Sequence, residues 1–228
     1  MAKNRTQWKK SLKQPDEFIT LSSRLFKIGI EQKNKITAAV GGLIILTLLI
    51  SGIRYVSFRT EERVFTSLSR IMVEFNRVET ENGFQEAYQA VKEELGELAD
   101  NYSGKTGGEF AGLTLAGLSF SAGDYPQAIE RYEAALSDFK GTEPFYDLVE
   151  TSLAYAYEET GAYDKAAALF EALTADPEAR NADEGLFALR RIYRALGKND
   201  QWVAVSETIA EKHPQSMYID IVKEAGTS

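Results

Sequence analysis

The sequence contains no cysteine, one histidine and five prolines, and the first two scarcities exclude several kinds of chemistry. Without cysteine there is no disulfide, no thiol nucleophile and no cysteine-based zinc site. The single histidine, His213, leaves almost no material for Ser-His catalysis or a histidine metal cluster. It precedes Pro214 at a predicted helix end, where the helix dipole favours it without a catalytic role. We therefore expect no enzyme activity, no cofactor and no metal.

Charge is absent from one stretch, and this divides the chain into three segments. Residues 1–35 carry nine Lys or Arg and three Asp or Glu, residues 36–53 carry no charged side chain, and residues 54–228 carry 17 basic and 31 acidic residues. As a helix, the run 36–53 spans about 27 Å, close to the hydrocarbon thickness of a bilayer. We predict a transmembrane helix. The alternatives are a buried core helix, which rarely lacks charge over five turns, and a cleaved signal peptide, which the absence of an A-x-A-like site disfavours.

The basic residues lie mainly before this span, which predicts a cytoplasmic N-terminus. Arg54, Arg59 and Arg63 follow the span and weaken the asymmetry, but a large acidic domain is translocated regardless of such charges. We expect a single-pass protein of the bacterial inner membrane with its C-terminal domain in the periplasm. The net charge of −14 on residues 54–228 argues against a nucleic-acid surface.

The basic segment 1–35 contains an amphipathic pattern in its second half. Its apolar residues fall on one side of a helix: Phe18, Leu21, Leu25, Phe26 and Ile28. The pattern predicts an interfacial helix on the inner leaflet, with a disordered basic tail as the alternative.

Residues 54–108 are predicted to form a stalk helix and an atypical first helical pair. One apolar stripe runs down the first helix at steps of four and three: Val64, Leu68, Ile71, Phe75 and Val78. Two heptads are too few for a coiled coil, so we expect the stripe to pack against a following helix at about 84–100. That helix has its own apolar face, formed by Phe84, Ala87, Val91 and Leu95.

A repeating unit occupies residues 109–225. Three glycines, Gly123, Gly161 and Gly197, recur at intervals of 38 and 36 residues, each between two apolar helical patterns. Around them small and aromatic residues recur in register: Leu115, Ala116, Ala128, Tyr132 and Ala135, then Leu153, Ala154, Tyr157, Tyr163, Ala166 and Phe170. Small residues let two helices approach closely while an aromatic ring fills the remaining gap. The pattern predicts helical hairpins in tandem.

These residues resemble those of the tetratricopeptide repeat, a 34-residue pair of antiparallel helices. The resemblance implies an all-α protein, an α-solenoid of about four helical pairs behind one transmembrane helix. The third unit departs from the pattern, because Arg190 replaces a small residue and Trp202 replaces alanine. We interpret residues up to 225 as a degenerate C-terminal cap that ends the stack.

A single N-terminal span, a basic cytoplasmic segment and an acidic repeat domain together resemble the YfgM type of bacterial inner-membrane protein. That resemblance implies an ancillary subunit of the Sec translocon that cooperates with periplasmic chaperones. The longer and more basic N-terminal segment of this chain departs from the pattern. We keep two alternatives, a structural subunit of another envelope assembly, such as cell-division or polysaccharide-export machinery, and an all-helical enzyme that uses carboxylates.

The stretch "GKT", Gly104 to Thr106, invites comparison with a phosphate-binding loop. Such a loop needs a glycine five residues before Gly104, and Ala99 stands there. No strand pattern leads into it. We interpret the glycine-rich stretch as a connector between helical pairs.

The first helices of the pairs should supply a partner-binding groove. The predicted residues are Phe110, Leu113, Gly117 and Phe120, then Leu148, Ser152, Tyr155 and Glu158, then Glu184, Phe187, Arg191 and Arg194. An apolar groove that ends in two arginines suits a peptide whose carboxylate the arginines bind. The alternative is that several of the aromatic residues belong to the core between repeats.

Overall fold

A computed structural model describes residues 30, 32–175 and 182–225, and these residues form helices and turns with no strand. The all-α prediction is confirmed for this part of the chain. The chain divides into two compact units, Met1–Arg59 and Thr60–Ser228. The predicted interfacial helix at 18–28 lies outside the described residues.

Helix α3, Lys33–Asn82, contains the uncharged run. An 18-residue window of this helix has a mean hydropathy of 2.3, and none of the window is buried. Within the run the hydroxyl of Thr47 donates to the carbonyl of Leu43, so that this polar group is satisfied inside the helix. Among the described helices, α3 is the one that is long and apolar enough to cross a membrane.

The second part of α3 forms the first helical pair with α4, Phe84–Asn101. Val64, Ile71 and Phe75 of α3 are buried with the apolar face of α4 in one core cluster, as the apolar stripe predicts. Phe75 meets Phe84 edge to face, with ring centroids 5.5 Å apart. The expected packing of these two helices is therefore confirmed.

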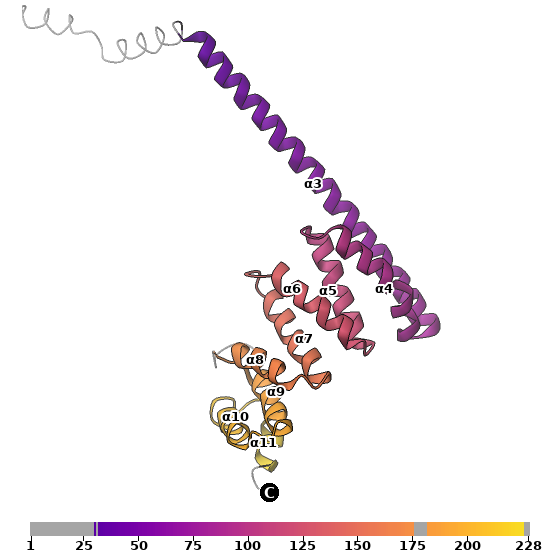
Figure 1. Cartoon of the computed structure of the whole chain (residues 1–228), viewed down its shortest axis with the longest axis vertical. Helices are drawn as coiled ribbons and strands as arrows, with labels where there is room; N and C mark the ends of the chain where they lie inside the picture. Colours follow the sequence, from indigo (N-terminus) through magenta and orange to yellow (C-terminus); the bar gives the residue numbers. More distant parts are fainter. Residues whose placement is uncertain (1–29, 31, 176–181, 226–228) are drawn as a thin grey trace, which may run out of the picture. The chain divides into compact units, whose positions relative to one another are not determined.

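Three further pairs follow in chain order (Figure 1). They are α5 and α6, Thr106–Ser121 and Tyr125–Asp138; α7 and α8, Phe145–Glu159 and Tyr163–Leu173; and α9 and α10, Ala182–Ala195 and Asn199–Lys212. A short helix, α11 at Ile219–Ala225, packs against α10. From α4 onward each helix contacts the next one, and the second part of α3 shares a core cluster with α4.

Small residues lie where the helices of a pair meet. Ala116 and Ala128 in the α5–α6 pair are fully buried, and so are Ala154 and Ala166 in the α7–α8 pair. The aromatic side chains Tyr132 and Phe170 are buried beside them. The small and aromatic residues that recur in the sequence therefore mark the positions where paired helices pack closely.

The recurrent glycines form the same turn at the end of each first helix. Gly123 has a φ of 77°, a conformation that other residues avoid, and Gly161 and Gly197 have similar positive values. The N–H of the residue after Gly123 donates to the carbonyl of Ser119, which satisfies an end carbonyl of α5. The glycines stop each first helix and let the chain reverse.

The α9–α10 pair lacks the small contact because Arg190 and Trp202 replace it. The Arg190 guanidinium lies 4.9 Å from the centroid of the Trp202 ring, and its Nε donates to the hydroxyl of Ser206. Arg190 is only 5% exposed, and its Nη2 has no hydrogen-bond partner among the described residues. Burial lowers its pKa from the ordinary value, with a smaller effect from Arg194. A stacked cation and ring thus fill the space that alanines fill elsewhere.

Candidate protein-binding surface

The first helices of the pairs, α3, α5, α7 and α9, form one surface, called here the A-helix wall. The nine residues predicted to bind a partner are Phe110, Leu113, Phe120, Leu148, Tyr155, Glu158, Phe187, Arg191 and Arg194, and all of them are partly or fully exposed. They fall into two groups with different surroundings. One group lies where α7 and α9 meet, and the other lies on α5 and the start of α7.

At the α7–α9 end, Tyr155 joins the two helices. Its hydroxyl donates to Oε1 of Glu184 on α9 at 2.8 Å, and its ring contacts Phe170 with centroids 5.1 Å apart. Burial, together with the Glu184 carboxylate, raises the pKa of Tyr155 far above its ordinary value, so the phenol stays protonated. Tyr155 therefore contributes to the contact between repeats as well as to the wall.

Arg191 is held by a carboxylate of the chain itself. Its Nε and Nη2 donate to the two carboxylate oxygens of Glu158 at 3.0 and 2.8 Å, a bidentate pair. The guanidinium also lies within 6 Å of the ring centroids of Tyr155 and Phe187. The sequence pattern predicts Arg191 and Glu158 as independent contacts for a partner, whereas the structure brings them together.

The C-terminal segment covers part of this end of the wall. Tyr218, which immediately precedes α11, stacks on Phe187 with ring centroids 4.3 Å apart and an interplanar angle of 9°. The hydroxyl of Ser216 donates to Asp183 at 2.7 Å, which ties the same segment to the start of α9. Arg194 remains exposed and forms no ion pair among the described residues.

At the α5 end, Phe110 belongs to a cluster of four phenylalanines. Its ring centroid lies 5.2 Å from those of Phe139 and Phe145, in edge-to-face contacts. Phe65 of α3 lies 6.3 Å from Phe110. Phe65, Phe139 and Phe145 are absent from the predicted groove. The sequence signals for them are an aromatic residue beside, but not on, the apolar stripe of α3, one in the connector after α6, and one at the first position of α7.

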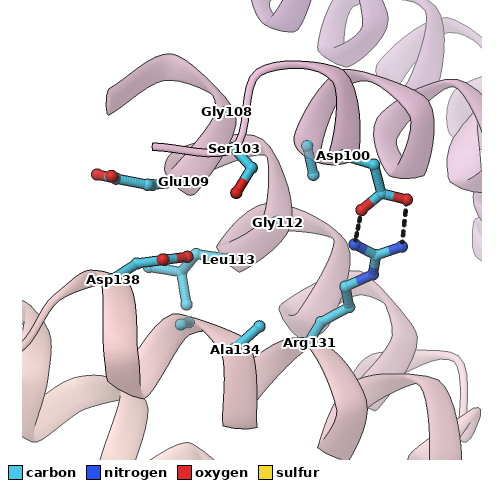
Figure 2. Close-up of a pocket in the computed structure, with 11 residues that line it drawn as sticks. Asp100, Ser103, Gly108, Glu109, Gly112, Leu113, Arg131, Ala134 and Asp138 are labelled. Atoms are coloured by element: carbon cyan, nitrogen blue, oxygen red, sulfur yellow. Dashed lines mark hydrogen bonds and ion pairs between the residues drawn. The ribbon is translucent and has the colours of Figure 1, made fainter. Parts of the chain in front are cut away.

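A small pocket opens beside this cluster between α4, α5 and α6 (Figure 2). Asp100 and Arg131 form a two-bond ion pair at one side of it, with distances of 2.5 and 3.3 Å. Glu109 and Asp138 line the other side (Figure 2). Burial raises the pKa of both carboxyls, and Asp138 and Glu61 contribute to the shift of Glu109. No group of three metal-ligating side chains occurs among the residues that the structure describes.

The glycine-rich stretch has a structural role at the N-terminus of α5. The backbone N–H groups of Thr106 and Gly107 donate to the carboxylate of Glu61 on α3, at 3.1 and 3.0 Å. An internal carboxylate thus occupies the position where a phosphate loop would hold its anion. A Cβ at Gly108 would lie 2.2 Å from the carbonyl oxygen of Tyr102. The stretch therefore begins α5 rather than forming only a connector.

The family described as "Tetratricopeptide repeat-like domain" matches residues 33–186 of the chain. The chain belongs to this family. The match takes in α3 to α8 and ends inside α9, before the Arg190 and Trp202 pair that departs from the tetratricopeptide pattern. No curated protein matches the chain. Tetratricopeptide repeat-like domains are in general scaffolds for protein–protein interaction rather than enzymes.

Proposed function

We propose that this protein is a membrane-anchored tetratricopeptide scaffold that binds partner proteins in the periplasm and assists secretion or envelope protein biogenesis beside the Sec translocon. The exposed apolar run of α3 is the observation that supports the membrane anchor. Its 18-residue apolar window is not buried against the rest of the protein, so in water all of its side chains would be exposed to solvent. The nine basic residues before the run favour a cytoplasmic N-terminus. The translocon assignment depends on the resemblance to YfgM-type proteins.

The partner would bind along the A-helix wall. Phe110, Leu113, Phe120 and Leu148 offer apolar contacts there, and Tyr155, Glu158, Phe187, Arg191 and Arg194 offer mixed polar and aromatic contacts. Arg194 is the more available arginine, because Arg191 is already paired with Glu158. Buried aromatic and arginine side chains dominate the energy of most protein interfaces.

The lack of cysteine makes the anchoring directly testable. In a Gram-negative host, Ser11→Cys and Ser137→Cys variants each carry a single thiol, since the wild-type chain has none. An impermeant maleimide should label Ser137→Cys in intact spheroplasts, and Ser11→Cys only after the membrane is permeabilised. Labelling in the reverse order would overturn the orientation, and recovery of both variants in the soluble fraction would overturn the anchor.

Crosslinking in the native membrane tests the partner. A photoreactive amino acid at Leu148 or Arg194 should capture translocon subunits or periplasmic chaperones. Capture of another envelope complex in their place would keep the scaffold and replace the Sec assignment with a structural role in that assembly.

A further inference from the structure

The α5 end of the wall presents a continuous apolar surface, called here the phenylalanine ledge: Phe65, Phe110, Phe145 and Leu148. The residues come from three successive first helices, α3, α5 and α7. Phe110 contacts both Phe65 and Phe145, and Leu148 follows Phe145 on the same face of α7, three residues later. The ledge is therefore one surface.

The outer members of the ledge are open to solvent. Phe65 is 42% exposed and Leu148 is 54% exposed, while the rings between them are partly buried. A single exposed apolar side chain needs no explanation, but contiguous ones across three helices are typical of an interaction site. At the α9 end, by contrast, Tyr218 covers Phe187.

Five carboxylates lie next to the phenylalanine cluster in the sequence: Glu109 beside Phe110, Asp138 beside Phe139, and Glu143, Asp147 and Glu150 within five residues of Phe145. Desolvation raises the pKa of Glu143 and of Glu150, and the charge of Asp147 raises both further. Desolvation also raises the pKa of Glu109 and of Asp138 beside the pocket, and the charge of Asp138 adds to the shift of Glu109. Repulsion between like charges therefore contributes to the raised pKa of Glu109, Glu143 and Glu150.

None of these five carboxylates forms an ion pair among the described residues, whereas Glu158 and Asp100 each bind an arginine. Lys140 lies close in the sequence but is exposed and makes no ion pair in the described part of the chain. A positively charged ligand would relieve the repulsion and gain charge-assisted contacts.

We propose that the phenylalanine ledge docks a basic amphipathic segment of a partner protein, with its apolar side chains on the ledge and its lysines or arginines facing the surrounding carboxylates. This proposal deepens the proposed function and rests on it, because it names the chemistry of the partner and the half of the wall that binds it. The carboxylates disfavour other occupants. An anionic lipid surface or a nucleic acid would meet like charge, and a second copy placed symmetrically would set carboxylate against carboxylate.

The test uses the full chain in nanodiscs of zwitterionic phosphatidylcholine, which give a basic probe no anionic lipid to bind. The probe is a fluorescent 18-residue amphipathic helix of leucine and lysine, and its charge control has glutamate in place of lysine. Fluorescence anisotropy should detect binding of the lysine probe and not of the glutamate probe. Equal binding of both probes, or no binding of either, would overturn the charge complementarity.

Two double variants separate the apolar and charged contributions. Phe65→Ser with Leu148→Ser should weaken probe binding about tenfold, and Glu143→Gln with Asp147→Asn about fivefold. All four side chains are exposed, so both variants should keep their helicity and melt at no lower a temperature than wild type. Matched controls on α10 and α11, Val203→Ser with Ile221→Ser and Glu207→Gln with Glu211→Gln, should stay within about twofold of wild type. Equal losses in the ledge and control variants would overturn the proposal.

Crosslinking from Leu148, followed by sequencing of the captured peptide, then examines the natural ligand. A captured segment with net positive charge and apolar residues at helical spacing supports the ledge, and an acidic segment, or one from a second copy of this chain, overturns it. If Arg194 captures a partner while Leu148 captures none, the ledge fails and the scaffold remains. If neither position captures a protein, the proposed function itself fails.

Discussion

The two ends of the A-helix wall are built from the same kind of helix but differ in how their side chains are satisfied. At the α9 end Arg191 is paired with Glu158 and Phe187 with Tyr218, while Arg194 forms no ion pair among the described residues. At the α5 end Phe65 remains exposed, and the carboxylates beside the ledge form no ion pairs among the described residues. The repeat architecture therefore determines where the wall lies, and internal pairing determines which part of it is open to a partner.

The largest expected effect is at the start of α5, where the ledge depends on a close backbone contact. Gly108→Ala places a Cβ against the Tyr102 carbonyl, 2.2 Å away, so one of the two backbones has to move. We expect a loss of about 3 kcal/mol in the free energy of unfolding, measured by urea denaturation. The phenylalanine ledge should lose probe binding together with stability.

Gly112→Ala, in the same helix, is the matched control. Its Cβ would meet the Cβ of Ala99 at 3.6 Å, an ordinary contact, and alanine favours helix over glycine by about 1 kcal/mol. It should be neutral or stabilising. If the Gly108 and Gly112 variants have equal stability, the close approach at Gly108 does not limit the fold.

The next effect tests whether both ends share one packing rule. Ala166→Leu puts a large side chain where α7 and α8 meet with no space, because Ala166 is fully buried. We expect a loss of about 2 kcal/mol in unfolding free energy, and a similar loss for Ala128→Leu between α5 and α6. Ala168→Leu, at an exposed position of α8, should change stability by less than about 0.5 kcal/mol. Unchanged stability at both buried alanines would contradict the repeat register.

The sequence predicts the features that depend on local spacing. Ala128, Tyr132 and Gly123 mark a helix contact and a turn whose geometry leaves little choice of residue, so their recurrence identifies the helical pairs. Local spacing does not predict contacts between side chains on helices that are far apart in the sequence. Phe65 meets Phe110 across 45 residues, and the contact depends on the rotation of α3 and α5, which no local pattern specifies.

The same limit applies to charge. Residue spacing places Glu158 and Arg191 on one wall, but whether they bind each other or a partner depends on the distance between α7 and α9. Glu61 at the N-terminus of α5 is a similar case, since its acceptor role needs α3 to pass beside Thr106. The sequence therefore predicts which helices form the candidate surface, but it does not predict which side chains on that surface remain unpaired.

A smaller change in stability is expected in the α9–α10 pair, where Arg190 replaces the small residue of the other pairs. Arg190 is a buried cation whose Nη2 has no partner in the described part of the chain, and replacing a buried ionic group by an apolar side chain of similar volume is often stabilising. We expect Arg190→Met to raise the unfolding free energy by about 1 kcal/mol in urea denaturation. Arg194→Met, at an exposed position, should change it by less than about 0.5 kcal/mol. A marked loss in Arg190→Met would mean that the contact with Trp202 outweighs the burial of charge.

The smallest effect concerns pH and separates the carboxylates that form no ion pair from those that bind an arginine. Glu109, Asp138, Glu143 and Glu150 have a folded-state pKa above the ordinary value, so between the two values the folded chain binds more protons than the unfolded chain. Stability should therefore rise as the pH falls from 7 to about 5, and the rise should be small because these groups are largely solvated. Urea midpoints at the two pH values measure the change.

The carboxylates that bind arginines have the opposite sign. Hydrogen bonds from Arg77 and Arg131 lower the pKa of Glu74 and Asp100, so their stabilisation is complete above the unfolded pKa of about 4 and is lost below it. The Glu143→Gln and Asp147→Asn double variant removes the repulsion near α7 and leaves these pairs intact. It should be more stable than wild type at pH 7 and show a weaker gain on acidification. An unchanged pH slope in this variant would mean that the carboxylates around the ledge do not repel one another in the free protein, and a basic partner would then have no strain to relieve.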